Sequence, residues 1–219
     1  MAPADTSRRE LRRSQHHDLS RSQLLDAAEE VFGTKGFHEA TLREVAERAE
    51  FSVGSVYSFF ENKDDLYLHV FLRRGDSFLD GIRAIVAGRH DPLDAVRRIV
   101  EFEVGWFRAH PHFARLYLRT SSIVRPVRGA GTDTFTEVID LQRGVLEAGQ
   151  ADGTIRPVDP TALLAVLSGI VTAFVSVDPV VRSGAAETVE QLPVEQLTEL
   201  VLAALAAPEK ASAGRGAAH

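Results

Sequence analysis

The chain has no cysteine among its 219 residues. This absence excludes disulfide bonds and thiolate metal sites, and it is compatible with a reducing compartment. Histidine is present, but no HExxH or similar ligand spacing occurs, so we expect no metal site. The sequence also lacks a glycine-rich phosphate loop and a GxSxG element. We therefore expect no cofactor and no enzymatic activity.

The sequence also lacks an apolar run long enough for a typical membrane span. Its most apolar run, 161–177, has 17 uncharged residues and lies between Asp159 and Asp178, whereas a span needs about 20 apolar residues. We interpret this run as a buried helix. The N-terminus is polar and has no apolar signal core. A cytoplasmic protein with no membrane partner is therefore expected.

Positive charge is not in excess. Lys and Arg number 25 against 31 Asp and Glu, which gives a net charge of −6. Composition alone therefore does not indicate a nucleic-acid partner, and any basic patch must be local. Residues 1–19 contain Arg8-Arg9, Arg12-Arg13 and His16-His17. We assign them as a disordered arm, which either makes no contact or lies along phosphates or in the adjacent minor groove.

The stretch from Thr41 to Lys63 has the pattern of two short helices around a tight turn, followed by the start of a third helix. Thr41 is a favourable N-cap, and Glu44 three residues later completes a capping box. The first helix fails near Glu50, and Ser52 then caps the second. Each short helix has an inner apolar face, made of Leu42, Val45, Ala46 and Ala49, then Val56 and Phe60. Two such crossed helices are typical of a helix-turn-helix DNA-binding unit.

Residues 21–66 resemble the DNA-binding domain of the TetR/AcrR family of transcriptional regulators. The resemblance is carried by LLDAAEEVFGTKGFHEATLREVAERA, then SVGSVYSFF, then NKDDLY, and covers roughly the first third of the chain. Two places depart from the family pattern: Glu50-Phe51 stands where Gly-Val is usual, and Phe59 where His or Tyr is frequent. The resemblance implies a homodimer that binds a palindromic double-stranded DNA operator.

The resemblance, carried over position by position, also implies which residues lie near DNA. Thr41, Tyr57 and Lys63 suit phosphate contacts, whereas Arg43 is able to bind a guanine through two hydrogen bonds. For each position an ordinary surface role is the alternative. The complete set is Thr41, Arg43, Val53, Gly54, Ser55, Tyr57, Ser58, Phe59 and Lys63.

We expect an all-α protein with four parts. Residues 1–19 form the disordered basic arm, 20–66 a three-helix helix-turn-helix domain that begins at Ser20 or Ser22, 67–207 a helical ligand-binding and dimerisation domain, and 208–219 a disordered tail. Asn62 is placed to cap the helix that connects the two domains. The later helices are expected at 63–86, 92–109, 111–122, 133–150, 159–177 and 193–207.

Aromatic side chains are concentrated in the central helices. Two interpretations are open: a plain apolar core, or an aromatic-lined cavity for a small apolar or amphipathic ligand. Glu103 lies on an apolar face, so its carboxylate needs a partner, in an ion pair or in a ligand. The candidate pocket residues are Phe102, Glu103, Trp106, Phe107, His110, Phe113, Tyr117, Phe135 and Phe174.

The last two long helices are apolar over more than one face. That much apolar helix surface in a chain of this size suggests a partner, and the resemblance implies the same, since family members pair these two helices into a four-helix bundle. The candidate interface residues are Leu163, Val166, Leu167, Ile170, Leu197, Val201, Ala204 and Leu205.

We predict a sequence-specific DNA-binding transcriptional regulator, a repressor released from its operator by a small apolar ligand. A ligand that wedges the central helices would pull the connecting helix and change the separation of the two recognition helices. These must meet successive major grooves, about 34–36 Å apart. Two alternatives stay open: a DNA-binding regulator without a small-molecule effector, and an all-α enzyme or carrier with a vestigial headpiece.

Overall fold

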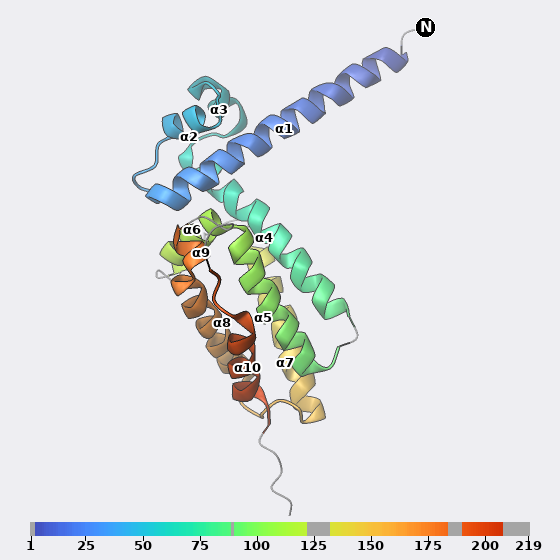
Figure 1. The fold of residues 1–219 in the computed structure, drawn as a ribbon. Coiled ribbons are helices and arrows are strands. Elements are labelled where there is room, and N and C mark those ends of the chain that lie inside the picture. The colour runs from blue at the N-terminus through green and yellow to red at the C-terminus, as the bar shows by residue number, and fades with distance from the viewer. Residues whose placement is uncertain (1–2, 89, 122–131, 184–189, 208–219) are drawn as a thin grey trace, which may run out of the picture.

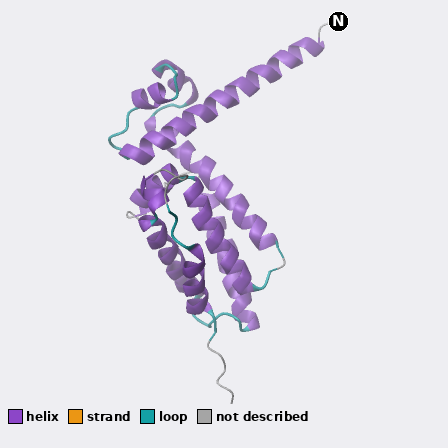
Figure 2. Ribbon diagram, viewed as in Figure 1, coloured by secondary structure: helices purple, strands orange, loops and turns teal. Residues whose placement is uncertain are grey.

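The structure, a computed structural model, describes residues 3–88, 90–121, 132–183 and 190–207. Within these ranges the chain is helical and has no β-strand (Figure 1, Figure 2), so the all-α prediction is confirmed. The predicted tail, 208–219, lies outside the described residues. The helices are α1 (Pro3–Lys35), α2 (Leu42–Arg48), α3 (Val53–Phe59), α4 (Lys63–Ala87), α5 (Pro92–Ala109), α6 (Pro111–Ser121), α7 (Thr132–Asp152), α8 (Pro160–Val177), α9 (Pro179–Ser183) and α10 (Val194–Leu205).

The headpiece, residues 20–66, folds around a small apolar core. The Thr41 hydroxyl accepts from the Glu44 amide at 3.3 Å, and the Glu44 carboxylate accepts from the Thr41 amide at 2.9 Å. Ser52 and Asn62 begin α3 and α4, each accepting a hydrogen bond from the backbone amide three residues later. All three predicted caps are confirmed. The buried side chains between the helices are Leu24, Ala28, Phe32, Val45, Ala46, Val56, Phe60 and Leu66.

Helix α1 begins at Pro3 rather than at Ser20 or Ser22, so the prediction of disorder for residues 1–19 is wrong over the described part of that segment. Its 33 residues make a helix about 50 Å long at 1.5 Å per residue. The N-terminal half runs past α3 and projects beyond the headpiece (Figure 1). Gly36 follows the last helical residue with φ of +85°, a conformation that glycine adopts without steric cost.

Helix α5 lies at the centre of the body, in contact with α4, α6, α7, α8 and α10. Helix α4 leaves the headpiece and runs along the body beside α5 and α7 (Figure 1). The two central helices approach closely at Gly81 of α4, where an added Cβ atom would lie 2.0 Å from Cζ of Phe102. The inward face of α5 carries Val96, Ile99, Val100, Glu103, Val104 and Phe107, all buried.

The headpiece contacts the body where α1 crosses α6. A Cβ atom on Gly33 would lie 2.4 Å from the carbonyl oxygen of His112, so the two backbones touch here. Arg115 and Arg119 of α6 donate to the carbonyl oxygens of Gly33 and Thr34 at 3.3 and 3.2 Å. These carbonyls belong to the last turn of α1, which a helix leaves without internal partners. Helix α6 therefore holds the C-terminal end of α1.

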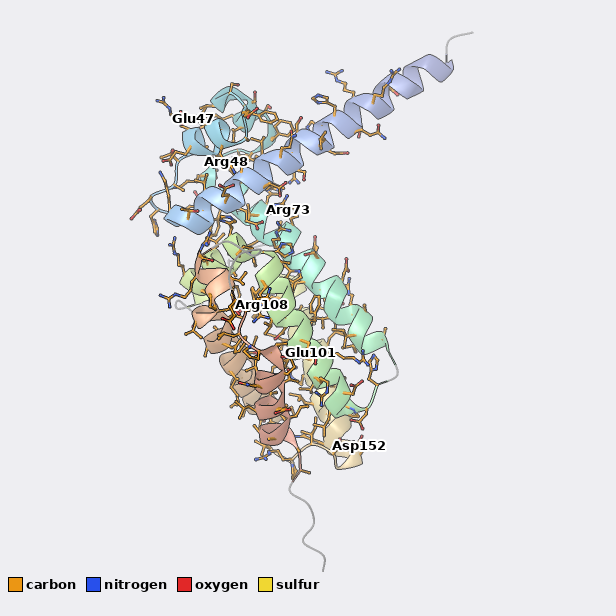
Figure 3. All side chains as sticks on the ribbon, in the orientation of Figure 1. Glu47, Arg48, Arg73, Glu101, Arg108 and Asp152 are labelled. Atoms are coloured by element: carbon orange, nitrogen blue, oxygen red, sulfur yellow. The ribbon has the colours of Figure 1, made fainter. Side chains whose placement is uncertain are left out.

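A second contact joins α1 to α4 through the buried carboxylate of Glu29. It accepts from Nε of Arg74 at 2.6 Å and from the Arg73 guanidinium at 3.3 Å. Arg73 also pairs with Asp26 at 2.8 Å, and Figure 3 shows it on α4 close to α1. Removing one partner of a buried ion pair costs about 3–5 kcal/mol. Both α4 and α6 therefore bind α1 through specific side-chain contacts.

Helix α8 has two different faces. Leu163, Leu164, Leu167, Val171 and Val175 pack into the body, whereas Val166 and Val177 are 53% and 56% exposed. The prediction of a buried helix therefore holds for one face only. By length and composition alone this helix could cross a membrane, which for a single helix is weak evidence.

Candidate DNA-binding surface and effector region

Helix α3 presents one face to the core and the other to solvent. Val56 and the following Phe60 are buried, at 0% and 2% exposure, whereas Val53 and Tyr57 are 37% and 57% exposed. An exposed tyrosine hydroxyl can contact a phosphate, and an exposed valine can contact a thymine methyl group. The structure therefore brings Val53 and Tyr57, with the exposed Gly54 and Ser58, together on one outward surface of α3.

Small residues make this surface of α3 shallow. The Ser58 hydroxyl donates to the carbonyl of Ser55 at 2.6 Å, and the Ser55 hydroxyl lies 2.8 Å from that of Ser52. Gly54 is exposed, and a Cβ there would meet only the Ser52 hydroxyl at 3.8 Å. Because the serine hydroxyls lie close to the helix, its backbone is able to approach the base edges.

The turn before α3 contains Glu50-Phe51, where the sequence departs from the family pattern. Glu50 has φ of +60°, and it is the one non-glycine residue with positive φ in the part of the chain that the structure describes. This left-handed conformation costs an L-residue roughly 1–2 kcal/mol. The amide of Phe51 donates to the carbonyl of Ala46 at 2.9 Å and closes the turn. The glutamate therefore occupies a position that favours glycine.

Two predicted contact residues lie at the start of α2. The Thr41 hydroxyl donates to the Glu44 carboxylate at 2.9 Å as part of the capping box. Arg43 Nε donates to the Glu47 carboxylate at 2.8 Å, with side chains 80% and 62% exposed; Figure 3 shows Glu47 at the outer side of α2. Such an exposed, solvent-screened pair contributes little to stability. Arg43 is therefore able to exchange Glu47 for a base or phosphate at little cost.

The side chain of Lys63 does not point outward. Its ammonium group donates to the carbonyl oxygens of Phe37 at 2.8 Å, Ala40 at 3.0 Å and His38 at 3.4 Å. It also lies 4.5 Å from the centroid of the Phe37 ring. The predicted phosphate contact by this side chain therefore does not fit its position. The ammonium group stabilises the loop between α1 and α2, and only the backbone amide at the start of α4 is left for a phosphate.

A contact that the sequence did not reveal holds the end of α3. The ring of His17 on α1 lies 4.7 Å from the ring of Phe59, which also contacts Phe60 at 6.4 Å. Phe59 is therefore half-buried between α1 and the headpiece core. The contact depends on α1 being helical at position 17, and composition gave no sign of that.

The candidate effector region is a cluster of aromatic rings between α4, α5 and α6. Trp106 lies 4.7 Å from the His110 ring and 5.5 Å from Phe113, and Phe107 lies 5.4 Å from Tyr117. Phe78 of α4 joins it, at 5.5 Å from Phe102 and 5.1 Å from Trp106. The residues that the sequence predicted for the pocket did not include Phe78.

Two predicted pocket residues lie apart from the cluster. Phe135 at the start of α7 is 52% exposed, so its assignment to a pocket is wrong for this conformation. Phe174 of α8 faces the guanidinium of Arg108, 5.9 Å from the ring centroid. Arg108 also pairs with the buried Asp178 at 2.7 Å. The position of Phe174 is therefore fixed by this ion pair on the other side of α5.

Glu103 is a buried carboxyl group in the middle of the body. Its one hydrogen-bond partner given by the structure is the Gln142 amide of α7, which donates at 2.7 Å. Burial raises the pKa of Glu103 to about 7, although the Gln142 hydrogen bond acts in the opposite direction. Burial, and secondly the charge of Glu103, also raise the pKa of Tyr117. The sequence left an ion pair or a ligand open as the partner of Glu103. In the structure the partner is the Gln142 amide, which the sequence did not reveal.

The histidines near this region have structural partners. Burial is the largest cause that lowers the pKa of His110 and of His112. The His112 ring nitrogen lies 2.7 Å from the Arg115 guanidinium. Across the described ranges, no group of three His, Cys, Asp or Glu side chains could hold a metal ion.

The predicted dimer residues divide into two groups. Leu163, Leu167, Leu197, Val201 and Leu205 are at most 6% exposed and belong to the protomer's own core, so assigning them to an interface is wrong. Ile170 is half-buried, whereas Val166 and Ala204 are exposed. The outward face of α8 and α10 consists mainly of small and apolar residues: Ala162, Ala165, Val166, Gly169, Ala173, Val177, Leu200, Ala203 and Ala204.

A capped helix, a tight turn and an exposed second helix, carried on an all-α body, define a helix-turn-helix DNA-binding regulator. Residues 24–70 match the family described as "Bacterial regulatory proteins, tetR family", and residues 92–191 match "Tetracyclin repressor-like, C-terminal domain". The chain belongs to the TetR family of bacterial transcription regulators. The predicted family and the prediction of a DNA-binding regulator are thereby confirmed.

Curated relatives are transcription regulators. The repressor KstR2 of Rhodococcus jostii is 30% identical over 190 residues, which span 86% of this chain and 92% of that protein. The repressor NicS of Pseudomonas putida is 27% identical over 154 residues, 66% of this chain and 69% of NicS. The activator FasR of Mycolicibacterium smegmatis is 33% identical over 120 residues, 55% of either protein.

Solved structures share the fold. The ketosteroid transcriptional regulator KstR2 of Mycobacterium tuberculosis aligns with a TM-score of 0.69 at 20% identity, over 86% of this chain and 95% of that one. FadR from Bacillus subtilis in complex with stearoyl-CoA aligns with a TM-score of 0.68 at 17% identity, over 83% and 95%. At these identities the likeness concerns the arrangement of helices alone.

Proposed function

We propose that the chain is a homodimeric repressor that binds a palindromic operator and is released when a small apolar or amphipathic ligand binds among the central helices. The observation that carries this proposal is the attachment of the exposed α3 surface to the effector region: the headpiece is held by α6 and α4, both of which line the aromatic cluster. Two of the relatives above are named repressors.

The DNA end of the mechanism rests on α3. Tyr57 and Val53 are exposed on it, and Arg43 at the start of α2 has only an exchangeable surface partner. Recognition helices of a twofold dimer meet half-sites about 34–36 Å apart. Any change in the separation of the two headpieces therefore weakens binding at one half-site or both.

The ligand end rests on the aromatic cluster. A ligand with an apolar body fits between the rings of Phe78, Trp106 and Tyr117 if these repack. The Glu103–Gln142 pair offers this ligand one hydrogen-bonding group in an otherwise apolar environment. FadR was solved with stearoyl-CoA, and the KstR2 structure is that of a ketosteroid regulator. Stearoyl-CoA and ketosteroids both have a large apolar part.

The contacts of α1 couple ligand binding in the aromatic cluster to the position of the headpiece. A ligand that separates α5 from α4 or α6 displaces Arg74, or Arg115 and Arg119, and these side chains bind α1 directly. The ligand shifts the population only by the difference between its affinities for the DNA-competent and DNA-incompetent states.

Dimerisation is proposed through the outward face of α8 and α10. Val166 and Leu200 are 53% and 69% exposed on it, and the small residues around them permit close helix packing. Val166→Glu is expected to convert the dimer to a monomer in analytical ultracentrifugation. Phe135→Glu, which changes an equally exposed apolar side chain on α7, is the control. A dimer that survives Val166→Glu places the interface elsewhere.

The test of the whole proposal begins with genomic DNA fragments selected by the purified protein. Operator affinity is then measured with and without stearoyl-CoA, a ketosteroid and nicotine as probes; the last is the effector named for the related HdnoR of Paenarthrobacter nicotinovorans. A probe that raises the melting temperature and weakens operator binding supports a ligand-released repressor. Tighter binding with the same probe, together with increased transcription, would instead favour an activator such as FasR.

A further inference from the structure

The headpiece is short of available positive charge. Residues 20–66 contain five Lys or Arg against ten Asp or Glu, whereas duplex DNA carries one negative charge per about 1.7 Å of its axis. All five cations have partners within the headpiece, and Arg43 is the one whose exposed partner we expect to exchange for DNA. Lys35 pairs with Glu44, Arg43 with Glu47 and Arg48 with Glu30; Lys63 binds three carbonyls, and Arg21 lies 5.3 Å from the centroid of the Phe60 ring.

Cations do lie beside α3, on the N-terminal half of α1. Arg12, Arg13, His16 and His17 are exposed and recur every four residues, so they share one face of the helix. Together with residues of the α3 region they line one open hollow of about 550 Å³, whose remaining walls are Ser20, Phe51, Ser55, Ser58 and Phe59. The cationic face of α1 and the recognition surface of α3 therefore border the same concave surface.

We propose that this face of α1 binds the phosphate backbone of the operator beside the major groove that α3 enters, with Arg12 and Arg13 as the contacting side chains. The proposal rests on operator binding by α3. Backbone binding is favoured over insertion into the minor groove, because a helix is about 10–12 Å wide with its side chains and the minor groove is only about 6 Å wide.

The contact between His17 and Phe59 holds the cationic face of α1 beside the recognition surface of α3. With ring centroids 4.7 Å apart, the end of α3 and the middle of α1 move together. Residues 3–19 of α1 continue for about 25 Å at 1.5 Å per residue, which is the length of about seven base pairs. Residues 3–19 also include the acidic residues Asp5, Glu10 and Asp18, and the Asp18 carboxylate lies 3.8 Å from His17. The arginines are therefore the groups that attract DNA.

The test compares the full-length protein with an Arg12→Gln/Arg13→Gln variant. Glutamine keeps helix propensity, and far-UV circular dichroism checks that α1 is intact. Operator affinity is measured over a series of KCl concentrations, using a fragment selected from genomic DNA. Arg98→Gln, which removes an exposed arginine from α5, controls for net charge, and Arg12→Lys/Arg13→Lys restores both charges.

Each lost phosphate contact makes the slope of log K against log salt shallower by about 0.9. A dimer that loses four arginines is therefore expected to show a slope shallower by about 3.6. Non-operator DNA should lose affinity by the same factor, because phosphates carry no sequence information. The lysine variant should retain most of the slope, and Arg98→Gln all of it. An unchanged slope in the glutamine variant overturns the proposal, even if affinity falls. If the unaltered protein selects no DNA at all, the failure lies with the proposed function instead.

Discussion

Gly33 of α1 and His112 of α6 meet backbone to backbone, at the point where the headpiece rests on the body. A Cβ atom on Gly33 would lie 2.4 Å from the His112 carbonyl oxygen. Only glycine permits this approach, and it brings the Gly33 carbonyl within 3.3 Å of Arg115. The headpiece and the effector region are thus linked by direct contact between two helices.

Gly33→Ala is expected to force α1 and α6 apart. The strain should lower the free energy of unfolding by about 1–3 kcal/mol and weaken operator binding as the headpiece shifts. Gly105→Ala is the matched control, because a Cβ on this exposed glycine of α5 meets nothing within 4 Å. The control should gain about 0.5–1 kcal/mol from better helix propensity. Urea unfolding measures both; equal stability of the two variants would contradict the close approach.

Glu50→Gly is expected to stabilise the headpiece. Glu50 has φ of +60°, and glycine removes a steric cost of roughly 1–2 kcal/mol, less the entropy that glycine adds to the unfolded chain. A net gain of about 1 kcal/mol should appear in urea unfolding. Glu50→Ala removes the same charge but keeps the strained conformation, so it should give no such gain. A comparable gain from alanine would attribute the effect to charge.

Lys63→Met tests the structural role of that side chain. Methionine keeps an apolar stem against Phe37 but removes the donor that binds three carbonyl oxygens. Hydrogen bonds from a charged donor contribute about 1.5–3 kcal/mol, so the melting temperature should fall. The slope of operator affinity against salt should stay the same, because no phosphate contact is lost. A slope shallower by about 0.9 per lysine, or about 1.8 for the dimer, would instead restore Lys63 as a phosphate ligand.

Local signals account for the parts of the fold that the sequence predicted correctly. The capping residues Thr41, Ser52 and Asn62 bond to backbone amides three residues later, so a local sequence pattern predicts them. The predictions that the structure contradicts concern residues whose partners are distant in the sequence. The polar composition of residues 1–19 predicts disorder, but α1 continues through residues 3–19 and His17 contacts Phe59.

Tertiary packing also decides the outcome for the sites. The ammonium group of Lys63 binds carbonyls more than 20 residues away in sequence, and no local pattern predicts that choice. The apolar residues of α8 predicted an interface, but the sequence did not say which face belongs to the protomer's core. Leu163 and Leu167 turned inward and Val166 outward.

Glu103→Gln is expected to remove a pH dependence of stability. Burial raises the pKa of Glu103 to about 7 in the folded chain, whereas a glutamate in an unfolded chain has a pKa of about 4.3. Between these values the folded chain keeps a proton that the unfolded chain releases. Stability therefore falls as pH rises through this window, by on the order of 3 kcal/mol, and levels off above about pH 7.

Urea unfolding at pH 5 and pH 8 measures this effect. Glu103→Gln should be more stable than the unaltered chain at pH 8 and differ little from it at pH 5. Glu101→Gln, which changes an exposed glutamate on the same helix, should leave the pH dependence intact. A Glu103→Gln variant with the original pH dependence would mean that the carboxyl group is solvated.

The central claim is that α3 is the surface that binds operator DNA. Tyr57 is 57% exposed on it, so Tyr57→Ala removes a contact with DNA and little packing. The most direct measurement is the affinity of this variant for a genomic fragment selected by the unaltered protein, with melting temperature and oligomeric state measured in parallel. Affinity is expected to fall by about tenfold or more, equivalent to about 1.4 kcal/mol, while the other two quantities stay the same. Unaltered affinity in Tyr57→Ala would contradict the account.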